Sequence, residues 1–80
     1  MQIDIELDTK GLSCPLPLLK AKQALNTMAA GAYLRVESTD AGSMRDFQSF
    51  IKQAGHTLHQ AEERDGVFIY LIEKNSLVSS

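Results

Sequence analysis

Cysteine is scarce in this chain, which has one cysteine, Cys14, and no tryptophan among its 80 residues. A single cysteine excludes an internal disulfide, and it argues against a zinc site built from clustered thiolates. Long apolar runs are also missing, because no stretch approaches the roughly 20 residues of a membrane-spanning helix. The start of the chain lacks the charged and then apolar profile of a signal peptide. Together with a free thiol, these absences predict a cytoplasmic protein without a membrane partner.

The chain also lacks an excess of positive charge. It has 8 Lys and Arg residues against 10 Asp and Glu residues, which gives a net charge of −2. Sequence-independent binding to nucleic acid needs a basic surface, so we expect no direct contact with nucleic acid. With 44% apolar residues, the composition is typical of a soluble globular domain. We predict a single domain over residues 1–74 and a loose tail over residues 75–80.

Apolar residues recur in the first half of the chain with the periods of a strand, a helix and a second strand. Residues 2–8 alternate apolar and polar side chains, which predicts a strand with one buried face. Residues 15–28 carry an apolar stripe at helical spacing, and residues 33–37 alternate again. Leu16 and Leu19 fall outside the stripe, on the polar face of that helix. The predicted stripe is Leu18, Ala21, Ala24, Leu25 and Met28.

The second half of the chain predicts a helix followed by a hairpin. A capping-box pattern, Ser43 with Asp46 three residues later, begins the helix. The hairpin joins a polar strand, suited to a sheet edge, to an apolar strand typical of a sheet interior. Its turn is the Asp65-Gly66 pair. The helix is predicted from residue 43 to a stop at Gly55, the polar strand over residues 57–63 and the apolar strand over residues 67–72.

The order of these elements, βαβαββ, predicts an α/β (α+β) fold. Crossover connections between parallel strands are right-handed, so both helices should cover one face of a mixed four-stranded sheet in a two-layer α/β sandwich. The other face is then uncovered, and one of two rows of the last strand must lie on it. We expect a partner or self-association surface there, in a monomer or weak homo-oligomer. The two rows are Val67, Ile69 and Leu71, or Phe68, Tyr70 and Ile72.

Cys14 stands where the first strand passes into the first helix. The free N–H groups and the dipole of a helix N-terminus stabilise a thiolate at such a position. We place Pro15 at the first helical position and Pro17 at the third, where proline is tolerated. Only the N–H of Leu16 is then left to hold the sulfur. The alternative is that Cys14 is a small buried apolar side chain without reactivity.

Other polar residues are expected near Cys14, because parallel strands end at the same edge of a sheet. Lys10 and Arg45 would favour the thiolate and nearby carboxylates would oppose it. For both cations, the alternative is an ordinary solvated surface residue. Asp8 is one of the carboxylates, or it caps the turn at Gly11 through its side chain. The expected neighbours of Cys14 are Lys10, Asp40, Ser43 and Arg45.

Leu16 and Leu19 flank the reactive end of the first helix. Single exposed leucines need no explanation, but an exposed apolar patch beside a reactive group marks an interaction site. We therefore predict that these two leucines contact a partner protein.

His56 and His59 do not suggest a metal site. Residues three apart in a strand face opposite sides of the sheet, so the two imidazoles should not share a ligand. The sequence predicts no metal site and no cofactor.

The stretch from Leu7 to Pro17 has the pattern Leu-Asp-x-x-Gly-Leu-x-Cys-Pro-x-Pro, with a CPxP motif at its end. This pattern resembles the signature of the TusA/SirA-like family, and the resemblance covers about residues 5–74. The matching residues are Leu7, Asp8, Gly11, Leu12, Cys14, Pro15 and Pro17, followed by Asp40, Gly42, Asp46, Gly55, His56, Asp65 and Gly66.

The resemblance implies a small sulfur-carrier fold in which Cys14 carries a persulfide. It implies a cysteine desulfurase or a rhodanese as sulfur donor, and tRNA thiolation, molybdenum-cofactor assembly or sulfur oxidation as the route served. Leu16 stands where several family members have an acidic or polar residue, so the acceptor stays open. A persulfide carrier needs one cysteine, whereas a thioredoxin-type oxidoreductase needs a second. We predict a sulfur carrier with persulfide sulfurtransferase chemistry at Cys14.

Two other hypotheses stay open. The chain could be a small binding or regulatory module with a non-catalytic cysteine, in which case Cys14 should react slowly with alkylating reagents. It could also be a single-cysteine peroxide sensor, in which case Cys14 should form sulfenic acid.

Overall fold

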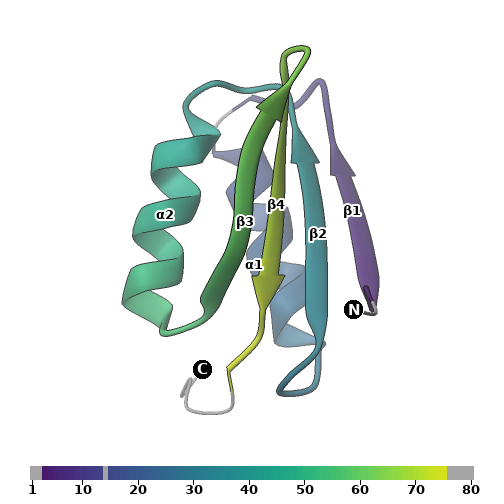
Figure 1. Cartoon of the computed structure of the whole chain (residues 1–80), viewed down its shortest axis with the longest axis vertical. Helices are drawn as coiled ribbons and strands as arrows, with labels where there is room; N and C mark the ends of the chain where they lie inside the picture. The colour runs from purple at the N-terminus through teal and green to yellow at the C-terminus, as the bar shows by residue number, and fades with distance from the viewer. Residues whose placement is uncertain (1–2, 14, 76–80) are drawn as a thin grey trace.

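Two helices and four strands follow one another in the predicted order in the computed structural model, which describes residues 3–13 and 15–75 (Figure 1). Cys14 and nearly all of the predicted tail lie outside the described residues. No helix within the described ranges is long and apolar enough to cross a membrane. The elements are β1 (Ile5–Thr9), α1 (Leu16–Asn26), β2 (Tyr33–Ser38), α2 (Ser43–Ala54), β3 (Thr57–Arg64) and β4 (Val67–Glu73).

The strands form one mixed sheet in the order β1-β2-β4-β3. β1 and β2 are parallel, and β4 pairs antiparallel with both β2 and β3. The polar strand β3 is therefore at an edge and the apolar strand β4 is interior, as predicted. Both helices lie on one face of the sheet, which confirms the two-layer sandwich (Figure 1). Asp65 and Gly66 have φ angles of 53° and 82°, as the predicted two-residue turn requires.

The core lies between the sheet and the two helices. Leu34 and Val36 of β2 are fully buried, and so are Tyr70 and Ile72 of β4. The ring of Tyr70 stacks on the ring of Phe47, with the ring centroids 4.4 Å apart. The two predicted apolar stripes supply the other layer, in which the most buried side chains are Ala21, Leu25, Met28, Phe47 and Ile51.

Strand β4 turns Val67, Ile69 and Leu71 toward the face that no helix covers, which selects one of the two predicted rows. Leu71 is nevertheless only 7% exposed, because side chains of the neighbouring strands close around it. They leave a hollow of about 150 Å³. Leu71 is thus covered by its own sheet, whereas Val67 and Ile69 are half-buried, and a partner surface on this face stays a prediction. The hollow is lined by Ile3, Arg35, Gln60, Glu62, Arg64, Ile69 and Leu71.

Helix α1 is shorter than predicted at both ends. It begins at Leu16, with Pro15 as the N-cap and Pro17 as the second helical residue. The predictions that Pro15 is the first helical residue and Pro17 the third are therefore wrong. The helix ends at Asn26 instead of Met28. The last turn tightens there, because the N–H groups of Thr27 and Met28 donate to carbonyls three residues back.

The predicted capping box at the start of α2 is wrong. Gly42 is the N-cap, and no side chain within residues 3–13 and 15–75 makes a capping hydrogen bond to the helix. The hydroxyl of Ser43 bonds instead to the hydroxyl of Tyr70, with the two oxygens 2.6 Å apart, and Asp46 lies in the first turn. The other end of α2 is as predicted, since Gly55 follows it in the left-handed conformation with φ at 82°.

The two imidazoles are apart, as predicted, although His56 lies just before β3 and only His59 belongs to the strand. His56 packs against Phe50 of α2, with the ring centroids 5.9 Å apart. His59 stacks on Tyr33 on the uncovered face, and its Nε2 lies 2.7 Å from a carboxylate oxygen of Glu73. Among the described residues, no group of three His, Cys, Asp or Glu side chains is placed to hold a metal ion.

Candidate functional site at the carboxyl ends of the parallel strands

The carboxyl ends of β1 and β2 and the starts of α1 and α2 meet at one edge of the sheet, the upper end in Figure 1. Sites in open α/β sheets usually lie at this edge. We call the two connections that meet there, residues 10–15 and residues 39–42, the rim. Cys14 belongs to the rim by its place in the chain but lies outside the described residues, and its chain neighbours Ser13 and Pro15 are exposed.

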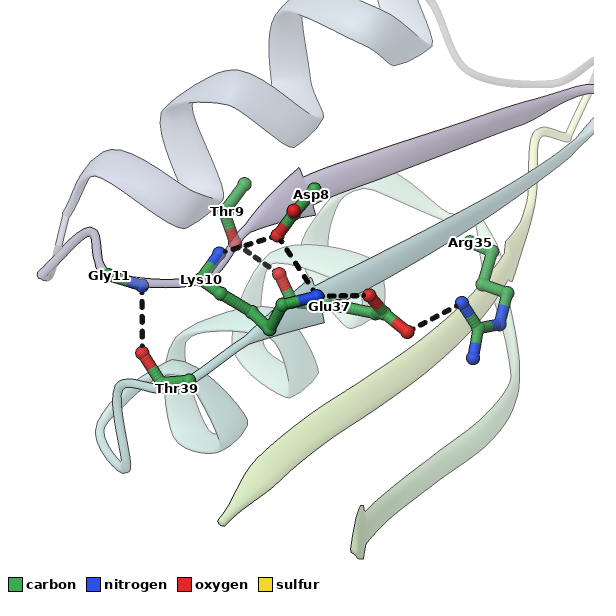
Figure 2. A network of polar contacts seen from close by, with 7 residues as sticks. All are labelled: Asp8, Thr9, Lys10, Gly11, Arg35, Glu37 and Thr39. Atoms are coloured by element: carbon green, nitrogen blue, oxygen red, sulfur yellow. Dashed lines mark hydrogen bonds and ion pairs between the residues drawn. The ribbon is translucent and has the colours of Figure 1, made fainter. Parts of the chain in front are cut away.

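Hydrogen bonds tie the first connection of the rim to the end of β2 (Figure 2). The buried hydroxyl of Thr9 donates to the carbonyl of Glu37 at 2.6 Å. The N–H of Gly11 donates to the hydroxyl oxygen of Thr39 at 2.9 Å. The N–H of Leu12 donates to the carbonyl of Thr9 at 3.1 Å. This closes a turn in which Gly11 has a φ of 86°, a conformation that favours glycine.

The charged side chains beside this connection compensate one another (Figure 2). The ammonium of Lys10 lies 2.8 Å from a carboxylate oxygen of Glu37 and 3.4 Å from one of Asp8. The hydrogen bond to Glu37 raises the pKa of Lys10, and the same bond, followed by that of Arg35, lowers the pKa of Glu37. Asp8 also accepts the N–H of Lys10 at 2.9 Å, so its side chain caps the turn one residue before Gly11.

The start of α1 offers fewer donors than the sequence suggested. The N–H of Leu16, which we expected to hold the sulfur of Cys14, donates to the carbonyl of Ser13 at 2.9 Å. The sulfur itself lies outside the described residues, so whether it also contacts this N–H stays a prediction. Pro17 is fully buried in the first turn, so it anchors the start of the helix to the core. No side chain of the described residues caps α1.

The second connection of the rim places the predicted neighbours differently. Ser43 is buried and paired with Tyr70, so its hydroxyl belongs to the core. Burial raises the pKa of Tyr70, the bond to Ser43 lowers it in part, and the charges of Asp40 and Asp46 raise it further. Arg45 is exposed on the first turn of α2, and Asp40 is half-buried in the connection that precedes this helix.

Leu16 and Leu19 are 42% and 48% exposed on the side of α1 that turns away from the core. The described ranges hold no other large apolar side chain as exposed as these two. Their predicted place outside the apolar stripe is confirmed. Leu12, by contrast, is half-buried.

The sequence analysis gave no role at the rim to four residues that shape it: Thr9, Glu37, Thr39 and Tyr70. The hydrogen bonds of Thr9, Gly11 and Ser43 described above join residues 27 or 28 positions apart. No local pattern signals a pairing over that distance, and a threonine at a strand end looks like any other strand residue.

Comparison with protein families finds a match to the model described as Sulfurtransferase TusA, over residues 5–74. The chain is 50% identical over 72 residues to the sulfur carrier protein TusA of Allochromatium vinosum, covering 90% of this chain and 95% of the relative. It is 40% identical over 73 residues to the sulfur carrier protein TusA of a Pseudomonas putida strain, covering 91% of each.

The fold also resembles a crystal structure, that of a SirA-like protein from Desulfitobacterium hafniense. The superposition has a TM-score of 0.78 at 28% sequence identity, covering 90% of this chain and 99% of the other. The matched range of the family model includes all six elements and both connections of the rim.

Proposed function

Because the chain belongs to the TusA sulfurtransferase family, we propose that it is a sulfur carrier that holds a persulfide on Cys14. The observation that carries the proposal is the 50% identity to a sulfur carrier protein over 90% of this chain. The assignment to Cys14 rests on chemistry, since a persulfide needs a thiol and this chain has one cysteine.

The proposed loading step is an exchange at sulfur. The thiolate of Cys14 attacks the terminal sulfur of a donor persulfide, R–S–SH. A bond forms between Sγ of Cys14 and that sulfur, and the S–S bond of the donor breaks. The electron pair of the broken bond leaves with the donor as a thiolate, R–S⁻, and the transferred sulfur keeps its proton. The product is Cys14–S–SH, with no net oxidation and no further reactant.

The rim supports this step mainly through the start of α1. Cys14 precedes Leu16, the first residue of the helix, by two positions, where the helix dipole favours a negative charge. Lys10 contributes less than its charge suggests, because two carboxylates already compensate its ammonium. Arg45 is exposed on the neighbouring helix start, and we propose it as the second source of positive potential.

The proposed carrier works between protein partners. We propose a cysteine desulfurase or a rhodanese as the donor, and a second protein as the acceptor. Leu16 and Leu19 supply the proposed contact surface, because they are exposed, apolar and next to the persulfide in the chain. We propose that the relay works in the cytoplasm, because a free thiol that must stay reduced between transfers suits a reducing compartment.

The experiment that tests the proposal loads the full chain with sulfur. The protein is incubated with a cysteine desulfurase and cysteine, and the intact mass is measured before and after dithiothreitol. We expect the wild type to gain one sulfur atom, which dithiothreitol removes. Reduction also excludes a sulfinic acid, whose two oxygens have nearly the mass of one sulfur and which dithiothreitol does not reverse.

Cys14→Ser is the matched control, because it removes the thiol and keeps the side-chain size. It should gain no sulfur under the same conditions. If the wild type stays unmodified while the desulfurase is turning over cysteine, the proposal is wrong. A Cys14 that alkylates slowly at neutral pH would then favour the binding module, and sulfenic acid at low peroxide would favour the sensor.

A further inference from the structure

The hydrogen bond between Gly11 and Thr39 points to a residue that acts on sulfur transfer without touching the sulfur donor. We infer that Thr39 is a positioning residue, whose hydroxyl holds the first connection of the rim in the conformation that a donor protein docks against. The inference rests on the proposed function, since it concerns the same transfer step.

The bond of Gly11 differs from the other backbone contacts of this connection. The N–H groups of Lys10 and Leu12 are accepted within residues 8–9, so they close the turn locally. The N–H of Gly11 crosses to Thr39, just beyond the end of β2, at 2.9 Å (Figure 2). It is the one of these three backbone N–H contacts that fixes the turn against the next strand.

The nearby ion pair cannot replace this bond. The ammonium of Lys10 also reaches β2, at Glu37, but it does so through a four-carbon side chain that leaves the backbone free to move. Both groups lie at the surface, where salt screens such pairs. Gly11 itself has no side chain and has the largest backbone freedom of any residue type. Within this turn, the position of Gly11 relative to the end of β2 therefore depends on its N–H.

The helix that follows is anchored independently of Thr39. Pro17 is fully buried, and the N–H of Leu19 donates to the carbonyl of Pro15 at 3.0 Å. Loss of the Thr39 bond should therefore leave α1 in place and loosen the surface beside it. A donor protein would then meet the docking conformation in a smaller fraction of molecules, which raises the apparent KM for the carrier and leaves kcat unchanged.

The test compares three variants of the full chain as substrates of a cysteine desulfurase supplied with cysteine. Thr39→Val keeps the side-chain shape and removes the acceptor oxygen, and Thr39→Ser keeps the oxygen. Thr27→Val is the matched control, because it removes a threonine hydroxyl that donates to Ala24 at 2.8 Å at the opposite end of α1. Amide hydrogen exchange at Gly11, followed by NMR, reports the bond itself.

We expect Thr39→Val to raise the KM for the carrier by about two- to tenfold, the range of one exposed hydrogen bond. The exchange of the Gly11 amide should accelerate by a similar factor. Thr39→Ser should restore both quantities to near the wild-type values, and Thr27→Val should change neither. Loading by glutathione persulfide, which needs no protein docking, should be the same in all variants.

Three outcomes would overturn the inference: an unchanged KM in Thr39→Val, an equal loss in Thr39→Ser, or an equal loss in Thr27→Val. In each of these cases the wild type still accepts sulfur, so the proposed function stands. If the wild type accepts no sulfur from an active desulfurase, the proposed function fails and the inference fails with it.

Discussion

Removing either hydroxyl of the buried Ser43–Tyr70 pair should destabilise the protein, whereas removing both should cost less than the sum of the two. The two oxygens lie 2.6 Å apart, with Tyr70 fully buried and Ser43 2% exposed. Tyr70→Phe leaves the serine hydroxyl without this partner in the core. Ser43→Ala does the same to the tyrosine hydroxyl.

The magnitude follows from burial. A buried polar group that loses its partner costs about 1–3 kcal/mol of stability, whereas replacing both partners with apolar groups is nearly neutral. We therefore expect each single variant to lose about 1–3 kcal/mol. The double variant should recover at least about 1 kcal/mol relative to the sum of the two losses.

The assay is urea unfolding followed by far-ultraviolet circular dichroism, since the chain has no tryptophan to serve as a fluorescent probe. Tyr33→Phe is the control, because it makes the same substitution at the other of the two tyrosines, on the uncovered face. It should change the free energy of unfolding by less than about 0.5 kcal/mol. Strictly additive losses in Ser43→Ala and Tyr70→Phe would refute the reasoning, because they would mean that the hydroxyls do not depend on each other.

The same pair predicts a pH dependence. Burial raises the pKa of Tyr70 above its ordinary value of 10.0, and the charges of Asp40 and Asp46 add to this. The unfolded chain therefore loses the tyrosine proton at a lower pH than the folded chain does. The folded state binds more protons above about pH 10, so the free energy of unfolding falls as the pH rises through that range. Wild type should lose stability there more steeply than Tyr70→Phe, and equal slopes would contradict the assignment.

Two further predictions concern the partner surface and the far end of the sheet. Leu19→Ser should raise the KM for the carrier in the desulfurase assay by about two- to tenfold, because it removes an exposed apolar contact. Gln23→Ser, an exposed control further along α1, should leave this KM unchanged. An equal rise in KM in both variants would contradict the proposed contact. The pKa of His56 is lowered from 6.5 first by burial and then by the charge of Lys74. As the pH falls, the imidazole of His56 is therefore protonated at a higher pH in the unfolded chain than in the folded chain. The free energy of unfolding should fall as the pH drops below about 6.5. The urea midpoint should therefore fall less between neutral and mildly acidic pH in His56→Gln than in the wild type. An equal fall in both proteins would contradict the role of His56.

The features that the sequence by itself determined are those with a local cause. Alternation in β1 and β2 predicts which side chains enter the core, because successive residues of a strand face opposite sides. The stripe of α1 does the same at helical spacing, and it left Leu16 and Leu19 outside, where the structure finds them. The Asp65-Gly66 turn and the stop at Gly55 need left-handed backbone, which these residue types accept.

The tertiary structure alone decided the features for which the local sequence allowed more than one arrangement. Ser43 had the spacing of a capping box, but its hydroxyl found Tyr70, 27 residues away, in a core that only the folded chain brings together. Both rows of β4 are apolar, so only the packing of the helices could select Tyr70 and Ile72 for the core. The N–H of Gly11 likewise found the hydroxyl of Thr39, 28 residues away, because the folded chain brings the two connections of the rim together. Local propensity sets the elements, whereas long-range hydrogen bonds depend on which strand ends meet at one edge.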